Sequence, residues 1–183
     1  NKRFIADDPQ PRDFPAQRTT TASGQYPFAV VLACIDSRST PEIVFDQGIG
    51  DIFTARIAGN YSNPGLLGSM EFATKIAGSR LIVVLGHTEC GAVKGACDDV
   101  KLGNLTTVVQ AIRPAVESVV EYSGEPNSSN KQFVLAVTEA NVRRTVEQIR
   151  EHSEIIRELE RSGQVKVVGA MHDIKTGRVT FLN

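Results

Sequence analysis

Two stretches of the chain decide its fold: FAVVLACIDSR at 28–38 and LIVVLGHTECG at 81–91. Each begins with an uninterrupted apolar run that contains two consecutive valines. A short run of this kind is typical of a strand that is buried on both faces, as in a parallel sheet. We therefore expect central strands at 28–33 and 81–85.

The rest of the chain alternates between strand and helix patterns. Further strands are expected at 52–56, 133–137, 165–170 and 178–182. Helices are expected to begin at Pro41 and to span 62–77, 105–122, 141–151 and 153–161. This alternation predicts an α/β fold with a mostly parallel central sheet flanked by helices. The connection into 178–182 is too short for a crossover, so that strand is expected to be an antiparallel edge strand.

Residues 1–24 differ from the rest of the chain. They are polar, contain three prolines and show no periodic apolar face, so we expect an extended N-terminal arm. Residues 25–183 are expected to form one domain, since a chain of 183 residues can bury a core of its own.

Composition excludes several kinds of partner. The 20 Lys and Arg nearly balance the 21 Asp and Glu, which argues against a nucleic-acid partner. The apolar runs are too short to cross a bilayer, so no membrane partner is expected. Three cysteines do not suggest a disulfide framework, and the cytoplasm is the expected compartment. An N-terminal signal that had been removed would instead indicate the periplasm or an organelle.

Potential metal ligands lie directly after both central strands. Cys34 comes directly after the first, and His87 and Cys90 come after the second. Reactive groups in parallel sheets gather beyond the carboxyl ends of the strands, so these three should meet if the strands are neighbours. Two thiolates and one imidazole form a zinc set that leaves the fourth tetrahedral position for water. The expected cofactor is therefore Zn²⁺.

Three further residues lie near these ligands in the sequence. Asp36 could be the fourth ligand or could accept a hydrogen bond beside the metal, and Arg38 is placed to form an ion pair with it. Cys97 lies seven residues beyond Cys90, which on a helix is a rise of about 10 Å. Cys97 therefore cannot share the metal and is expected to pack in the core.

The motif Cys34-x-Asp36-Ser37-Arg38, together with His87-x-x-Cys90-Gly91, strongly resembles the β-class carbonic anhydrases, and the resemblance spans 25–182. It implies that Cys34, His87 and Cys90 bind zinc. It also implies reversible hydration of carbon dioxide to bicarbonate and a proton by zinc-bound hydroxide. In this family the aspartate either pairs with the arginine or becomes the fourth ligand in a closed state.

The same resemblance implies a substrate pocket. Gln25 resembles a glutamine that donates a hydrogen bond toward the substrate, and Gly91 a glycine whose N–H faces it. Phe53, Phe72 and Ala58 would form an apolar wall, to which the neighbouring subunit contributes. A homodimer or a dimer-based tetramer is therefore expected.

The resemblance also indicates a branch of the family. Members gated by bicarbonate carry a tryptophan shortly before the first zinc cysteine and a tyrosine near the last strand. This chain has no tryptophan, and His172 stands near the tyrosine position. The plant-like branch with an open site is therefore expected, although Phe72 replaces a tyrosine that is frequent there.

Two other functions fit the same ligands. A related zinc hydrolase of carbonyl sulfide or carbon disulfide would use the same zinc chemistry. A non-enzymatic structural zinc module would need Asp36 as a permanent fourth ligand.

Overall fold

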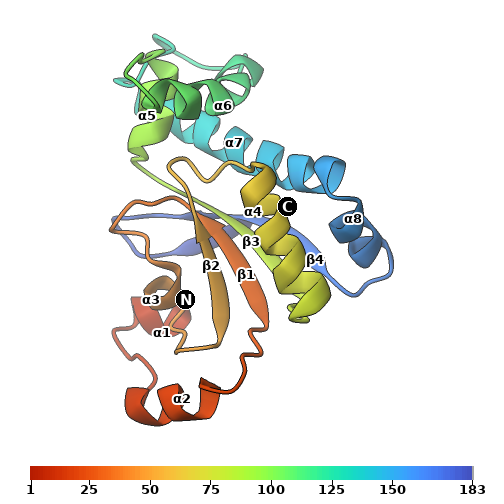
Figure 1. Ribbon diagram of the computed structural model, residues 1–183. Helices are drawn as coiled ribbons and strands as arrows, with labels where there is room; N and C mark the ends of the chain where they lie inside the picture. Colours follow the sequence, from red (N-terminus) through yellow and green to blue (C-terminus); the bar gives the residue numbers. More distant parts are fainter. Residues whose placement is uncertain (183) are drawn as a thin grey trace.

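A five-stranded sheet forms the centre of the computed structural model, which describes residues 1–182 (Figure 1). In the sheet order β2-β1-β3-β4-β5, all neighbouring strands are parallel except the last pair. The strands are β1 (Ala29–Ala33), β2 (Ile52–Arg56), β3 (Leu81–His87), β4 (Lys166–His172) and β5 (Val179–Leu182). This topology confirms the prediction of an α/β fold with an antiparallel edge.

Both faces of the central strands are covered, which explains their uninterrupted apolar sequence. Side chains alternate between the two faces of a strand. Val30 and Leu32 of β1 join a core with α4 (Pro64–Glu71), α7 (Lys131–His152) and α8 (Glu154–Arg161), whereas Val31 and Ala33 join a smaller core on the other face. All five residues of β1 are buried.

The predicted helices are largely present. They are α3 (Pro41–Val44), α4 (Pro64–Glu71) with its π-helical continuation η1 (Phe72–Ile76), α5 (Gly91–Cys97), α6 (Leu105–Ser118), α7 (Lys131–His152) and α8 (Glu154–Arg161). The Asn63 side chain accepts a hydrogen bond from Leu66 N and so begins α4. Within residues 1–182, no helix combines the length and the apolar character that crossing a membrane requires.

The prediction of a strand at 133–137 is wrong, because these residues belong to the first turns of α7. The Asn130 side chain accepts a hydrogen bond from Phe133 N and begins the helix. Residues buried at helical spacing then continue to Ile149, while Leu135, inside the apolar run, is exposed. Five apolar residues fit either structure; the periodicity over the whole 22-residue segment decides for the helix.

The expectation of an extended N-terminal arm is also wrong in part. Residues 1–24 contain two helices, α1 (Lys2–Ile5) and α2 (Phe14–Thr21), and none of their residues is buried. The Asp13 side chain caps α2 by accepting a hydrogen bond from Ala16 N. Arg3 and Arg12 form ion pairs with the buried side chain of Asp46, which fastens the arm to the loop after α3.

Helix α7 approaches the sheet closely at two glycines. A Cβ atom on Gly169 would lie 2.8 Å from Cγ1 of Val142, and one on Gly86 would lie 2.5 Å from Cγ2 of the same valine. Neither distance is compatible with normal packing, so the contact between α7 and strands β3 and β4 requires glycine at both positions.

We expect Gly169→Ala to lower the free energy of unfolding by about 1–3 kcal/mol, because the added methyl group overpacks the contact with Val142. Chemical denaturation measures this loss, and adding Val142→Ala should recover part of it. Gly95→Ala is the matched control: its Cβ would meet nothing closer than 3.7 Å, so stability should not fall. Equal losses in Gly169→Ala and Gly95→Ala would contradict the close packing.

Candidate metal centre

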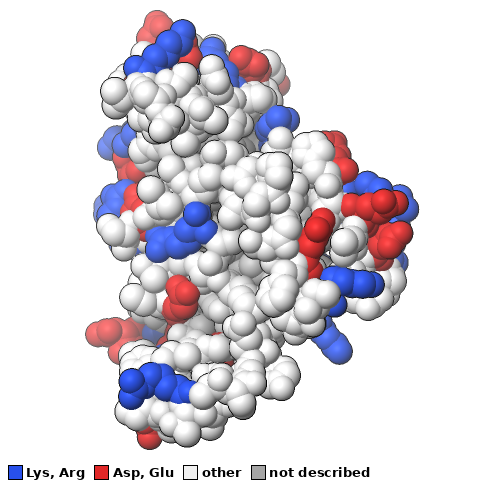
Figure 2. Space-filling view, in the orientation of Figure 1, with Lys and Arg blue, Asp and Glu red and all other residues white. Residues whose placement is uncertain are grey.

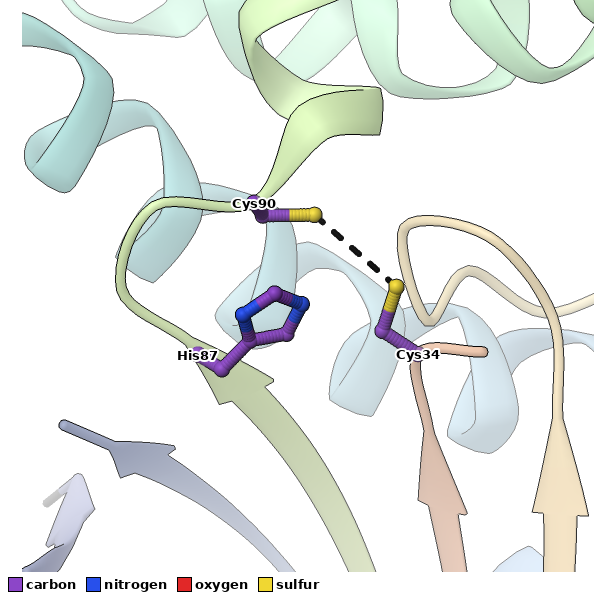
Figure 3. A group of neighbouring side chains, drawn as sticks. All are labelled: Cys34, His87 and Cys90. Carbon is purple, nitrogen blue, oxygen red and sulfur yellow. Dashed lines mark hydrogen bonds between the residues drawn. The ribbon is translucent and has the colours of Figure 1, made fainter. Parts of the chain in front are cut away.

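Two loops at the carboxyl ends of β1 and β3 bring two cysteines and a histidine together (Figure 3). Cys34 comes directly after β1, His87 ends β3, and Cys90 is the N-cap of α5. The parallel register pairs Ala33 with Leu85, which places the ends of the two strands side by side. The predicted convergence of the three residues is therefore confirmed.

The geometry of this group fits a tetrahedral metal ion. The Sγ atoms of Cys34 and Cys90 lie 3.9 Å apart, and the ligand atoms of all three residues lie within 4.8 Å of one another. Two sulfurs on one zinc are expected about 4 Å apart, because each Zn–S bond is near 2.3 Å. All three side chains are buried.

The histidine presents a free lone pair to this group. Its Nδ1 lies 2.9 Å from the carbonyl oxygen of Thr88, which can only accept, so Nδ1 carries the proton. In the neutral ring, which is the form that binds metal, the lone pair is then on Nε2, and this atom is buried with no hydrogen-bond partner among residues 1–182. A buried nitrogen without a partner is costly unless it binds something, and a metal ion satisfies it.

The sulfur atoms of Cys34 and Cys90 are hydrogen-bonded to each other, and this contact favours the thiolate form of Cys34. The hydrogen bond between the two sulfurs lowers the pKa of Cys34, and the N–H of Gly59, 3.3 Å from its sulfur, acts in the same direction. The same interaction with Cys34, together with burial, raises the pKa of Cys90. Metal binding favours loss of the remaining proton, because the thiolate is the form that ligates. These residues therefore fit Zn²⁺ as the cofactor.

Arg56, at the end of β2, fixes the loop that carries Cys34. Its Nε donates to the carbonyl oxygen of Cys34 at 2.8 Å, and its Nη2 donates to that of Asp36 at 2.6 Å. Residues 34 and 36 thus have their backbone positions set by a neighbouring strand. The motif pattern did not reveal this role of Arg56.

Asp36 and Arg38 form a two-point ion pair beside the cluster. Nε and Nη2 of Arg38 donate to Oδ1 and Oδ2 of Asp36 at 2.9 and 2.7 Å, and the Arg38 N–H also donates to Oδ1. These hydrogen bonds from Arg38 hold the pKa of Asp36 well below its usual range. Oδ2 of Asp36 also lies 3.9 Å from Nε2 of His87, so the carboxylate borders the cluster.

The loop between His87 and Cys90 has a strained backbone. Glu89, which precedes Cys90, has a φ of 58°, a left-handed conformation that is uncommon for residues other than glycine. Arg38 Nη2 donates to the Glu89 carbonyl oxygen at 3.4 Å and so links the two loops. Strain of this kind is typical of functional sites.

The predicted pocket residues occupy different places in the chain. Phe53 and Phe72 stack edge-on, with ring centroids 6.2 Å apart, and line a shallow pocket together with Val30 and Leu66. Cys34, His87 and Cys90 do not line that pocket. In a single chain the aromatic pair is therefore not part of the lining around the metal ligands.

The other three residues predicted for the substrate pocket are Gly91, Ala58 and Gln25. Gly91 begins α5, and a Cβ there would meet nothing within 4 Å, so its backbone borders open space. Ala58 precedes Gly59, whose N–H contacts Cys34. Gln25 is exposed and precedes the amino end of β1, whereas Cys34 lies just past its carboxyl end. The two residues therefore lie beyond opposite ends of the same strand.

Cys97 lies outside the metal-binding group. It ends α5 and is buried among apolar residues that include Val109 and Phe133, as the helical spacing predicted. Burial raises the pKa of its thiol to about 11, so it is uncharged at neutral pH. It therefore serves as a core residue.

Comparison with known proteins agrees with this site. The family model described as carbonic anhydrase matches residues 29–179. Carbonic anhydrase 2 of Mycobacterium tuberculosis is 36% identical over 182 residues, covering 99% of this chain and 87% of that protein. A carbonic anhydrase of Mycolicibacterium smegmatis is 35% identical over 180 residues, covering 98% of this chain and 86% of that protein.

Solved structures show the same architecture. The β-carbonic anhydrase CafA of Aspergillus fumigatus superposes with a TM-score of 0.80 at 26% identity, covering 92% of this chain and 81% of that one. A tetrameric β-carbonic anhydrase of Sordaria macrospora gives a TM-score of 0.78 at 24% identity, covering 93% and 85%. With its Cys34–His87–Cys90 centre and these similarities, the chain belongs to the β-class carbonic anhydrase family.

Proposed function

We propose that this protein catalyses the reversible hydration of carbon dioxide to bicarbonate and a proton. The observation that carries the proposal is the three-ligand centre of Cys34, His87 and Cys90, beside which Asp36 is engaged by Arg38. Three protein ligands leave a fourth tetrahedral position free for water. Zinc held by these three ligands would lower the pKa of a water in the fourth position toward neutrality and so make that water a nucleophile.

In this proposal Asp36 orients the nucleophile. Its carboxylate borders the cluster, with Oδ2 3.9 Å from His87 Nε2, and can accept a hydrogen bond from the attacking oxygen. Arg38 keeps this carboxylate ionised and turned to one side. The resting site would then be open, as in the plant-like branch. The same pairing argues against a structural zinc module, which needs Asp36 as a permanent ligand.

Substrate contacts are part of the same proposal. Carbon dioxide is small and apolar, so the wall of Phe53, Phe72 and Ala58 suits it, and the Gly91 N–H would donate to the developing bicarbonate oxygen. Gln25 is too far along the sheet to serve the site of its own chain. We assign it, with the Phe53–Phe72 pair, to the site of a partner subunit.

That assignment requires a homodimer or a dimer-based tetramer. Near the edge strand β2 and α4, large apolar side chains are exposed: Tyr26, Phe28, Phe72 and Ile76. Figure 2 shows few charged side chains over the middle of this face. Exposed apolar patches of this kind mark contact surfaces between proteins. The tetrameric enzymes of Sordaria macrospora have the same fold.

We assign the protein to the cytoplasm. Cys34, Cys90 and Cys97 are all free thiols. The metal centre depends on two of them remaining reduced, which a reducing compartment favours. Fractionation of the source cells, with immunodetection of the protein, tests this assignment.

Metal analysis tests the ligand set. We expect one zinc per chain in the wild-type protein and a large loss of zinc in Cys34→Ser and Cys90→Ser, because each removes a thiolate ligand. Cys97→Ser is the matched control and should retain full zinc, since Cys97 lies outside the group. Elemental analysis of purified protein gives the ratio, and loss of zinc in Cys97→Ser would contradict the assignment.

Stopped-flow hydration of carbon dioxide tests the activity. The zinc-loaded wild type should exceed the buffer rate at neutral to alkaline pH, and Asp36→Ala should lower kcat by about 10²-fold or more, because the nucleophile loses its orienting acceptor. Asp8→Ala, an exposed carboxylate in the arm, should leave the rate unchanged. A wild-type rate no higher than that of buffer would refute the proposed function.

Light scattering tests the assembly. At micromolar concentration we expect the mass of a dimer or a tetramer. Phe72→Asp should shift the mass toward the monomer, because a charge on the apolar face opposes its burial. Leu102→Asp, at a similarly exposed leucine in the loop before α6, should not change the mass. A monomeric wild type would contradict the assignment of Gln25 to a partner.

A further inference from the structure

His172 is a buried histidine for which the proposed mechanism has no role. It ends β4 and is only 2% exposed. Its Nδ1 lies 2.9 Å from the hydroxyl of Ser39, across 133 residues of sequence. Its Nε2 has no hydrogen-bond partner among residues 1–182, so Ser39 is the polar anchor of this ring within the described chain.

Ser39 belongs to the turn that carries Asp36 and Arg38. The Ser39 N–H donates to the carbonyl oxygen of Asp36 at 3.1 Å, and the Ser39 side chain is buried. Its hydroxyl therefore ties the far end of this turn to the end of β4. Arg56 thus holds the backbone of this turn at residues 34 and 36, and the Ser39 hydroxyl holds it at residue 39.

The backbone of His172 also contacts the loop between the metal ligands His87 and Cys90. Parallel pairing places His172 beside His87, and the Thr88 N–H donates to the carbonyl oxygen of His172 at 2.9 Å. Two residues on, the N–H of Ile174 donates to the Thr88 hydroxyl at 3.0 Å. One residue at the end of β4 thus joins both loops of the metal centre, one through its backbone and the other through its side chain.

The ring also contacts an aromatic side chain of the N-terminal arm. Phe4 of α1 meets it edge-on, with ring centroids 6.4 Å apart. The N-terminal arm therefore covers His172 and limits the positions that its ring can take. A buried ring that is confined by packing and bonded at one nitrogen is well suited to hold a turn in a single conformation.

We propose that His172 is a positioning residue, whose hydrogen bond to Ser39 holds the 36–39 turn so that Asp36 faces Arg38 and the fourth metal position stays open. Without this bond, the Asp36 carboxylate, already 3.9 Å from His87 Nε2, can move in and take that position. The inference rests on the proposed function, since it assigns the open position to the reacting water.

Cobalt-substituted protein tests the proposal without reliance on catalysis. Co²⁺ adopts the tetrahedral geometry of zinc, and its visible absorption changes when an added anion occupies the fourth position. Titration with azide therefore reports whether that position is open. The variants are Ser39→Ala, His172→Phe and the pair combined, with His152→Gln, an exposed histidine at the end of α7, as the control.

The double variant, Ser39→Ala with His172→Phe, separates an effect on the position of the turn from a loss of stability. Each single substitution leaves a buried polar atom without its partner, whereas the pair replaces both partners with apolar groups and restores stability. If the bond only supports stability, azide binding in the double variant should return to that of the wild type. If it positions the turn, azide binding should stay weak even though stability is recovered.

We expect the apparent Kd for azide to rise about tenfold or more in Ser39→Ala and in the double variant, as when the competent state falls to a tenth of the population. His152→Gln should not change it. Adding Asp36→Asn to Ser39→Ala should restore tight binding, because the competing carboxylate is gone. Wild-type affinity in the double variant, or no restoration by Asp36→Asn, overturns the proposal.

The two proposals fail in different ways. A protein that binds azide with the expected pattern but does not hydrate carbon dioxide retains the positioning role and loses the proposed function. A protein that hydrates carbon dioxide and keeps wild-type azide affinity in the double variant retains the function and loses the positioning role.

Discussion

The parallel pairing of β1 with β3 is the constraint on which the site depends. Its register sets Ala33 beside Leu85, so that the residues just past these two strands meet although more than fifty positions separate them. A slip of one residue would turn Cys34 toward the opposite face of the sheet, away from His87. Both strands are apolar throughout and almost entirely buried, so their hydrophobic pattern alone does not select this register, and the metal centre depends on the pairing that the folded sheet adopts.

Burial gives this centre its chemical character. Cys34 and Cys90 are part of an apolar cluster with α5, α6 and α7, so they lie away from bulk water, where electrostatic interactions are strong. The Gly59 N–H and the Thr88 carbonyl serve the cluster from the backbone, without adding charge. The Asp36–Arg38 pair, by contrast, is in contact with solvent, because the Arg38 side chain is half exposed. The site thus combines a dry set of ligands with a charged pair that solvent can reach.

Local sequence predicted the elements wherever one signal dominated. Strand β2 occupies 52–56 as expected, and Pro64 marks the start of α4. The error at 133–137 arose because five apolar residues suit either a strand or a helix, and the Asn130 cap lies within a run of turn-forming residues. In the arm, α2 has no buried residue, and the expectation of an extended arm took no account of Asp13 as a helix cap.

Residue types and their spacing were enough to predict the chemistry: two cysteines, a histidine, an aspartate and an arginine in family-specific spacing, placed after strands that the apolar runs identify. The contacts that support this chemistry became visible only in the folded chain: Arg56 donates to the Cys34 carbonyl oxygen, and Ser39 is hydrogen-bonded to His172. Local patterns encode periodicity and caps, which act over a few residues. A hydrogen bond that spans 133 residues exists only once sheet order and register have brought its two partners together.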